Sequence, residues 1–375
     1  MTIFQPQTLP DGLLETGFSW EVRTDSWLGG DWLGRVPVAG GSVTWSRGQQ
    51  VQGSLSLTVP RVGAASADED ARDWTPVSEE SPLSCLGQIL HVTAEVGSLV
   101  SEERWTFPLG RFLITQWEIV STSIRITGKS LLHHLEEDRL TRPTAPLDGG
   151  RLSTELRRLV GGYLGVSIDR GLVDRACPSM SWGESRIDAV YEIADAWPAR
   201  IREGPDGVLH VLPPVQELSA RPARTLTDGA AGTVIGVSRQ ASRGGVHNRV
   251  VVRGQDQDGP GNPRFQAVAD QSTGPMRVGG PYGTVTKFFS SPLITSPVIA
   301  LETATTMLTD SVRRQTTVPV THVPDPTLGL DDPVELITHP AEGAAPITSW
   351  GVVSAMEIPL VPGSAARTDI EVIAP

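Results

Sequence analysis

Gly128-Lys129-Ser130 comes closer to a catalytic motif than any other segment of this chain. It has the ending of a phosphate-binding loop, and it lies between a predicted strand and a predicted helix. The full motif also requires a glycine at the position of Ser123. Because residues 123–127 themselves follow a strand pattern, no loop remains to wrap a phosphate. We therefore expect an ordinary turn from strand to helix.

Two other groups of residues fall short of a metal site. His133 and His134 are adjacent, so on a helix their side chains point about 100° apart and cannot share one ion as an i, i+4 pair does. Asp256, Asp258 and Gly259 resemble the beginning of a calcium loop, but no glutamate follows at the required spacing. We expect a charged, solvated helix end and a plain turn.

The candidate nucleophiles also lack the surroundings of an active site. The segment from Gly236 to Gln240, around Ser238, is one glycine short of a nucleophile elbow and lacks the helix that should follow. Cys85 and Cys177 have no metal-ligand partners at short spacing, and we expect two buried free thiols. The sequence therefore predicts a protein that is not an enzyme and holds no cofactor or metal.

Composition narrows the classes of partner. The 375 residues carry a net charge of -12, which argues against nucleic-acid specificity because that depends on neutralising phosphates with Lys and Arg. Apolar runs are about three or four residues long, far below the ~20 that a membrane span needs. The first residues have no basic, apolar leader, so we expect synthesis in the cytoplasm. The strong excess of arginine over lysine indicates a GC-rich source genome.

The elements that would position a site begin with a β-rich region over residues 1–127. Alternating apolar and polar residues predict strands, and their spacing suggests an antiparallel barrel or sandwich. Residues 63–81 are rich in Ala, Ser, Asp and Glu and predict a mobile surface loop. The expected strands lie at 42–47, 54–59, 88–96, 111–120 and 123–127.

Residues 128–222 change to a mixed helical pattern. Helices are expected at 130–138, 153–164 and 184–197, and the last has an apolar stripe at helical spacing. A hairpin at 199–212 follows, with a Gly-Pro-Asp-Gly turn.

Residues 223–375 return to a β pattern, so the predicted fold class is α+β and β-rich. One helix is expected from about 297 to 314, with Val298, Leu301, Leu308 and Val312 on one side. The expected strands lie at 233–239, 247–254, 284–289, 316–323, 334–337, 350–358 and 368–373. Two β modules around a helical one are compatible with a loose duplication.

Large aromatic residues are the candidates for packing or subunit contacts. Ten tryptophans outnumber three tyrosines, and four of the tryptophans lie in the first 45 residues. Large aromatic side chains dominate the energetics of cores and interfaces. An aromatic platform for sugars is the alternative. The candidate residues are Trp27, Trp32, Trp45, Phe288 and Phe289.

Several motifs together resemble the minor tail proteins of phages that infect actinobacteria. These proteins are similar in turn to the tail-hub fold of siphophage tail-tip proteins and contractile-tail hubs. The resemblance covers most of the chain, and the GC-rich composition agrees with such a host. The motifs are residues 33–44 (LGRVPVAGGSVT), Trp182 with 185–190 (SRIDAV), 280–293 (GPYGTVTKFFSSPL) with the helix that follows, 325–334 (DPTLGLDDPV) and 358–363 (IPLVPG).

The resemblance implies two tail-tube-like β-barrel modules, residues 1–127 and 223–375, with a helical α/β module at 128–222 between them. Three copies would form a ring of six barrels that joins the six-fold tail tube to the three-fold tip. The implied location is the tail tip of the virion. The implied partners are further copies in a homotrimer, distal tail or tail-tube proteins, the tape measure protein and tip fibre proteins.

Two alternatives remain open at this stage. The chain could be another tail-tip component, such as a distal-tail ring or a baseplate protein that binds host carbohydrate through its tryptophans. It could also be a wall-degrading hydrolase, but such a domain normally shows a compact Cys/His, Glu or zinc constellation, and none can be assembled here.

Overall fold

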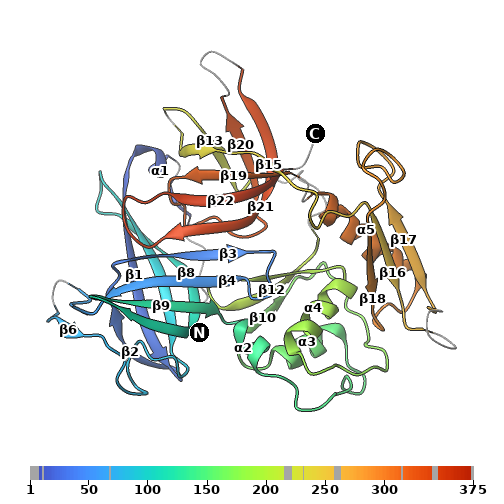
Figure 1. Ribbon diagram of the computed structural model, residues 1–375, viewed down its shortest axis with the longest axis horizontal. Helices are drawn as coiled ribbons and strands as arrows, with labels where there is room; N and C mark the ends of the chain where they lie inside the picture. The colour runs from blue at the N-terminus through green and yellow to red at the C-terminus, as the bar shows by residue number, and fades with distance from the viewer. Residues whose placement is uncertain are drawn as a thin grey trace.

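A computed structural model describes residues 8–10, 12–66, 69–214, 222–230, 232–256, 263–313, 316–339 and 345–372. Its body is a 14-stranded sheet that takes strands from both ends of the chain (Figure 1). The N-terminal strands are β1 (Phe18–Leu28), β2 (Asp31–Val36), β3 (Gly40–Ser46), β4 (Gly53–Pro60), β7 (Ile89–Ser98), β8 (Arg104–Val120) and β9 (Ser123–Ser130). The C-terminal strands are β13 (Arg224–Thr227), β14 (Val234–Val237), β15 (Gln240–Ala241), β19 (Thr316–His322), β20 (Pro333–Thr338), β21 (Ile347–Pro359) and β22 (Ala366–Val372).

The two sets of strands meet where β3 pairs with β21. The antiparallel register runs from Ser42 opposite Pro359 to Ser46 opposite Ala355. Trp20 strengthens this join, since its Nε1 donates to the carbonyl of Pro359 at 3.2 Å. In the described residues the main strand order runs from β14 to β2 without closing. The β-rich class is confirmed, whereas the two closed barrels are not.

The remaining elements form two smaller α/β assemblies and a short ribbon. A sheet of β10 (Gly165–Ile168), β12 (Val208–Leu212) and β11 (Arg200–Glu203) lies with α2 (His133–Glu137), α3 (Leu152–Val160) and α4 (Arg186–Ala196). A second sheet of β17 (Gln266–Asp270), β16 (Arg249–Arg253) and β18 (Thr286–Ser290) packs against α5 (Pro297–Arg313). The ribbon pairs β5 (Val62–Gly63) with β6 (Arg72–Asp73), and α1 (Leu13–Thr16) precedes β1.

Buried apolar side chains form two cores. The first lies on the large sheet and combines N-terminal residues with residues 226–234 and 318–370. The second combines residues 131–211 with residues 250–308. Each core therefore draws on segments that are distant in the sequence. The division into modules at residues 127 and 222 stays a prediction.

Local sequence signals explain why most expected elements form. Ser185 caps α4, because its hydroxyl accepts a hydrogen bond from the amide of Asp188 at 3.2 Å. The apolar stripe of this helix is buried in the second core, as its spacing predicted. Alternating burial along β3 and β4 likewise follows the pleat of a half-buried strand.

The apolar side of helix α5 is oriented differently from the prediction in its first half. Val298 is 75% exposed and Leu301 is 52% exposed, whereas Ala300 and Ala304 are buried. The small alanine side chains let the helix lie close to β16 and β17, which contact it. On the same predicted side, Leu308 is buried and Val312 packs against the second core. The prediction was therefore wrong for Val298 and Leu301 but not for the second half of the helix.

The segment expected as a mobile loop is anchored where the structure describes it. Trp74 is only 3% exposed, and its Nε1 donates to the carbonyl of Gly63 at 2.9 Å. The guanidinium of Arg72 lies 3.8 Å from the centre of the Trp74 ring. The pairing of β5 with β6 fixes the same segment. The described residues hold no helix that is both long enough and apolar enough to cross a bilayer.

Candidate functional site

The Gly128–Ser130 motif lies within a strand and not in a phosphate-binding loop. Gly128 pairs with both Leu55 and Ile114 across β9. Lys129 makes an ion pair with Glu136 at 3.2 Å. Ser130 ends the strand, and its hydroxyl accepts a hydrogen bond from the amide of Gly53 at 3.1 Å. The strand therefore extends through all three residues, and the turn towards α2 follows them instead of including them as predicted.

The two adjacent histidines have separate partners. His133 lies between Glu136 and Glu137, with nitrogen–oxygen distances of 2.7 and 3.2 Å. The ring of His134 stacks on Tyr163 at 4.8 Å between centroids. No group of three potential metal ligands occurs among the residues that the structure describes.

Ser238 and the cysteines show no catalytic arrangement either. Gly236 lies in β14 and Ser238 directly follows that strand, with its amide bonded to the carbonyl of Pro319, and the next element is β15 rather than a helix. Both cysteines are free, but Cys85 is exposed, so its predicted burial was wrong. Burial raises the pKa of the Cys177 thiol to about 11, which keeps it protonated. The calcium-loop motif extends into residues 257–259, which lie outside the described residues.

Two of the predicted aromatic residues meet on the hairpin of β1 and β2. Trp27 lies opposite Trp32 in the strand register. Trp27 stacks on His91 with ring centroids 5.3 Å apart, and burial lowers the pKa of that histidine to about 4. Trp32 is 58% exposed, and its Nε1 donates to Asp25 at 3.1 Å. Trp32 is therefore available as a contact residue, whereas Trp27 is half-buried.

The other predicted aromatics have different positions. Trp45 belongs to the first core, where its Nε1 donates to the carbonyl of Leu109 at 3.0 Å. Phe289 packs against the second core. Phe288 is 61% exposed, and the guanidinium of Arg253 lies 5.0 Å from its ring centre. The five candidates thus divide into packing residues and exposed residues, and no single site unites them.

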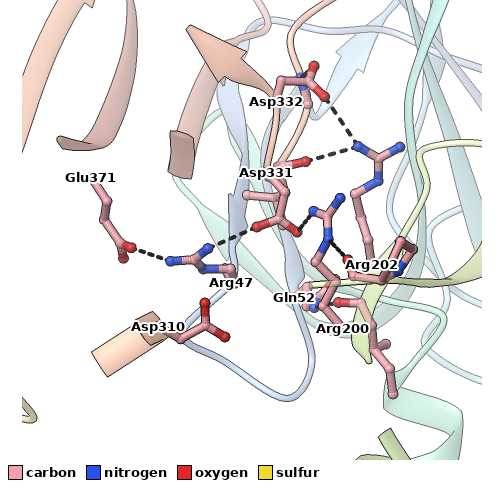
Figure 2. Close-up of polar contacts among 12 residues, drawn as sticks. Arg47, Gln52, Arg200, Arg202, Asp310, Asp331, Asp332 and Glu371 are labelled. Atoms are coloured by element: carbon pink, nitrogen blue, oxygen red, sulfur yellow. Dashed lines mark hydrogen bonds and ion pairs between the residues drawn. The ribbon is translucent and has the colours of Figure 1, made fainter. Parts of the chain in front are cut away.

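A charged junction, which motif reasoning did not find, connects the two cores (Figure 2). The first core supplies the loop residue Asp331, with Arg47 from the turn after β3 and Glu371 from β22. The second supplies Arg200 and Arg202 from β11. These five residues and the loop residue Asp332 define the junction.

Asp331 is the centre of the charged junction. Its side chain is 1% exposed and lies between Arg47 Nη1 at 3.0 Å and Arg200 Nη1 at 2.6 Å. Arg47 also pairs with Glu371, and Arg202 reaches Asp332 at 3.3 Å. Asp331 has a positive φ of 64°, a conformation that Asp tolerates better than most residues. The backbone therefore presents the carboxylate to both arginines.

A second buried polar contact lies beside the charged junction. The Gln52 amide donates to the carbonyl of Ile201 and accepts from the amide of Glu203, each at 2.8 Å. The Glu203 carboxylate accepts backbone amides of Leu131 at 2.8 Å and Leu132 at 3.4 Å. Burial raises the pKa of Glu203 to about 7, although hydrogen bonds from neighbouring groups oppose this shift.

A pocket of about 280 Å³ lies next to Glu203 and Arg202. Its walls are mainly apolar and include Trp45 and Met356. The two charged groups already have partners within the chain, namely Asp332 for Arg202 and backbone amides for Glu203. The residues that line the pocket contain no pairing of a nucleophile with a base.

We expect Asp331→Asn to destabilise the chain by about 3 kcal/mol, because it leaves two arginines partly uncompensated at a buried site. Asparagine has nearly the same shape as aspartate and tolerates the positive φ, so the loss of stability is due to the loss of the negative charge. Urea unfolding measures the change in the free energy of unfolding. The control is Asp369→Asn, which removes an exposed ion pair with Arg367 and should change stability by about 0.5 kcal/mol or less. Equal effects of the two substitutions would contradict the role of the junction.

The elevated pKa of Glu203 predicts a pH dependence. Its usual pKa is 4.5 and its folded value is about 7, so the folded chain binds the proton more tightly in this interval. The free energy of unfolding should therefore fall as pH rises from about 4.5 to about 7, by on the order of 3 kcal/mol from this group. Glu203→Gln should flatten that fall in urea titrations, whereas the exposed Glu21→Gln should leave it in place. The same slope in Glu203→Gln and in the unchanged chain would refute this assignment.

No protein-family model matches the chain, and no curated protein matches it significantly. Solved structures of tail proteins match it over nearly their whole length. The tail protein of Neisseria meningitidis MC58 has a TM-score of 0.62 at 13% identity, with 93% of this chain and 96% of that chain covered. The 43 kDa tail protein of prophage MuSo2 from Shewanella oneidensis has a TM-score of 0.58 at 12% identity, with 93% and 98% covered. The prophage tail protein gp18 of Listeria monocytogenes has a TM-score of 0.53 at 10% identity, with 93% and 94% covered. The chain therefore has the fold of these tail proteins, in agreement with the predicted resemblance.

Proposed function

We propose that this chain is a structural minor tail protein of a phage, and that it forms the tail-tip or baseplate hub. The observation that carries the proposal is the match in fold to tail proteins over more than nine-tenths of both chains. Because the match covers nearly all of both chains, it is not limited to a single domain that unrelated proteins also contain. At identities of 10–13% it concerns the fold, and the role in the particle is our inference.

The contacts made by the residues of the candidate motifs support a role without catalysis. Each described motif is occupied by contacts that build the fold. Lys129 pairs with Glu136, and His133 with its neighbouring glutamates. The polar groups at the pocket serve the connection between the cores. We propose that the protein acts through its surfaces.

In this proposal, the N-terminal and C-terminal strands of the large sheet correspond to two tail-tube-like modules. Three copies would then present six such modules to the six-fold tube and three equivalent positions to the tip. The partners would be further copies, distal tail or tail-tube proteins, the tape measure protein and tip fibre proteins. The sequence motifs and the arginine-rich composition favour an actinobacterial host and a siphophage particle.

The decisive experiment combines solution mass with imaging of tails. Light scattering of the purified protein should give three times the chain mass of 40.1 kDa. Electron cryomicroscopy of purified tails should place three copies at the tip. A stable monomer that is absent from the particles would overturn the proposal.

The Trp27–Trp32 pair favours a second candidate, a baseplate protein that binds host carbohydrate. The exposed Trp32 ring offers a flat apolar face of the type that sugars stack on. This candidate predicts that purified protein binds labelled wall polysaccharide and that Trp32→Ala removes the binding. Phe288→Ala, which removes an exposed aromatic ring from a different sheet, should not affect it. Failure of the unchanged protein to bind would exclude this candidate.

A further inference from the structure

Charge is distributed very unevenly along this acidic chain. Residues 243–290, here called the basic lobe, contain six basic and three acidic residues, a formal charge of +3. The whole chain carries -12, so the rest carries -15. Arg249 pairs with Asp270 at 2.6 Å, which neutralises one acidic residue of the lobe. The bases that are exposed are Arg243, Arg264, Arg277 and Lys287.

The basic lobe also has apolar side chains on its outer face. Val251 lies opposite Val268 on one side and beside Phe288 on the other, so the three side chains form a row across the sheet. Val268 is 44% exposed and Phe288 is 61% exposed. Helix α5 covers the opposite face of this sheet. Exposed aromatic and arginine side chains together are typical of the energetic centres of interfaces.

An acidic segment lies at the other end of the molecule. Residues 69–80 contain five acidic residues and one basic residue. All five acidic side chains are exposed, and Val77 between them is 86% exposed. Buried Trp74 anchors the segment. In Figure 1 the ribbon that contains β6 lies at the left edge, whereas β16, β17 and β18 lie at the right edge.

We infer that the basic lobe of one copy docks against the acidic segment of the next copy. The two surfaces have opposite charge, each has exposed apolar side chains, and they lie at opposite edges of the molecule in Figure 1. A contact between two different surfaces of the same protein is heterologous. Repeating such a contact from copy to copy produces a closed ring when the rotation between neighbouring copies divides a full turn evenly. This inference rests on the proposed hub function and identifies the surfaces that would join its copies.

The charges give the contact a clear signature. Opposite surface potentials speed encounter and fix the register, and added salt screens them. The apolar row through Phe288 would stay in contact at high salt. Self-association of the chain should therefore weaken as salt is added, but some association should remain at high salt because of the apolar contacts.

The experiment is a charge swap measured by sedimentation velocity at about 0.05 M and about 0.5 M salt. The lobe variant is Arg253→Glu, beside the Phe288 ring, with Arg277→Glu, and the segment variant is Glu79→Lys with Glu80→Lys. Each should weaken self-association about tenfold or more, because like charges then face each other. The variant that carries all four substitutions should recover association. The control is Arg142→Glu with Arg170→Glu, two exposed residues outside both surfaces, which should associate like the unchanged chain.

Recovery in the fourfold variant supports the contact, because separate folding defects would add instead of cancelling. Normal association of the lobe variant, or no recovery in the fourfold variant, would overturn it. Binding of a DNA duplex to the lobe without charge-dependent self-association would also overturn it and assign the lobe to a polyanion. The presence or absence of the chain in purified tails tests the hub function separately. A chain that is present in tails but insensitive to these substitutions would refute the contact alone.

Discussion

The pairing of β3 with β21 is the constraint on which the rest of the structure depends. It joins strands that lie some 300 residues apart in the sequence into one sheet. The chain between β9 and β13 must therefore leave the large sheet and come back to it. Residues 131–211, together with residues 250–308, form a second core away from this sheet. The result is one continuous sheet with the two α/β assemblies beside it (Figure 1).

The attachment is polar where the two cores meet. Asp331 brings together an arginine from each side, and Gln52 satisfies backbone groups of β11. Buried ion pairs contribute little net stability, because removing the charges from water costs about as much as their attraction returns. Their geometry is nevertheless demanding, since an unpaired charge at this depth is strongly unfavourable. The junction therefore fixes how the cores are oriented more than how tightly they adhere.

Periodic elements were predictable from the sequence, because burial on one side of a strand or helix leaves a repeating pattern. Helix α4 and strands β3, β4 and β9 follow such patterns closely. Strand β1 was missed, since its polar residues Thr24 and Ser26 are fully buried and disturb the alternation. The exposure of Val298 and Leu301 in α5 was not predicted, because the smaller side chains of Ala300 and Ala304 pack in that half of the helix.

The charged junction could not be predicted, because it depends on contacts between residues as distant as Arg47 and Asp331. No local pattern encodes which arginine will meet which carboxylate. Similarly, the aromatic candidates looked equivalent in sequence, and only tertiary structure separates core Trp45 from exposed Phe288. Resemblance to tail proteins indicated the fold correctly, whereas closure of the strands into barrels depends on long-range pairing that composition does not specify.

The late arrival of β21 has a consequence for biosynthesis. On a translating ribosome, β3 emerges about 300 residues before its partner, an interval of roughly 15–60 s at usual elongation rates. During that time the nascent chain presents an open strand edge, the kind of surface on which strands of other chains can pair. Many copies made at once from one message would bring such edges close together. A β21 from one chain could then complete the sheet of another, so correct folding depends on each chain closing its own sheet before it meets a neighbour.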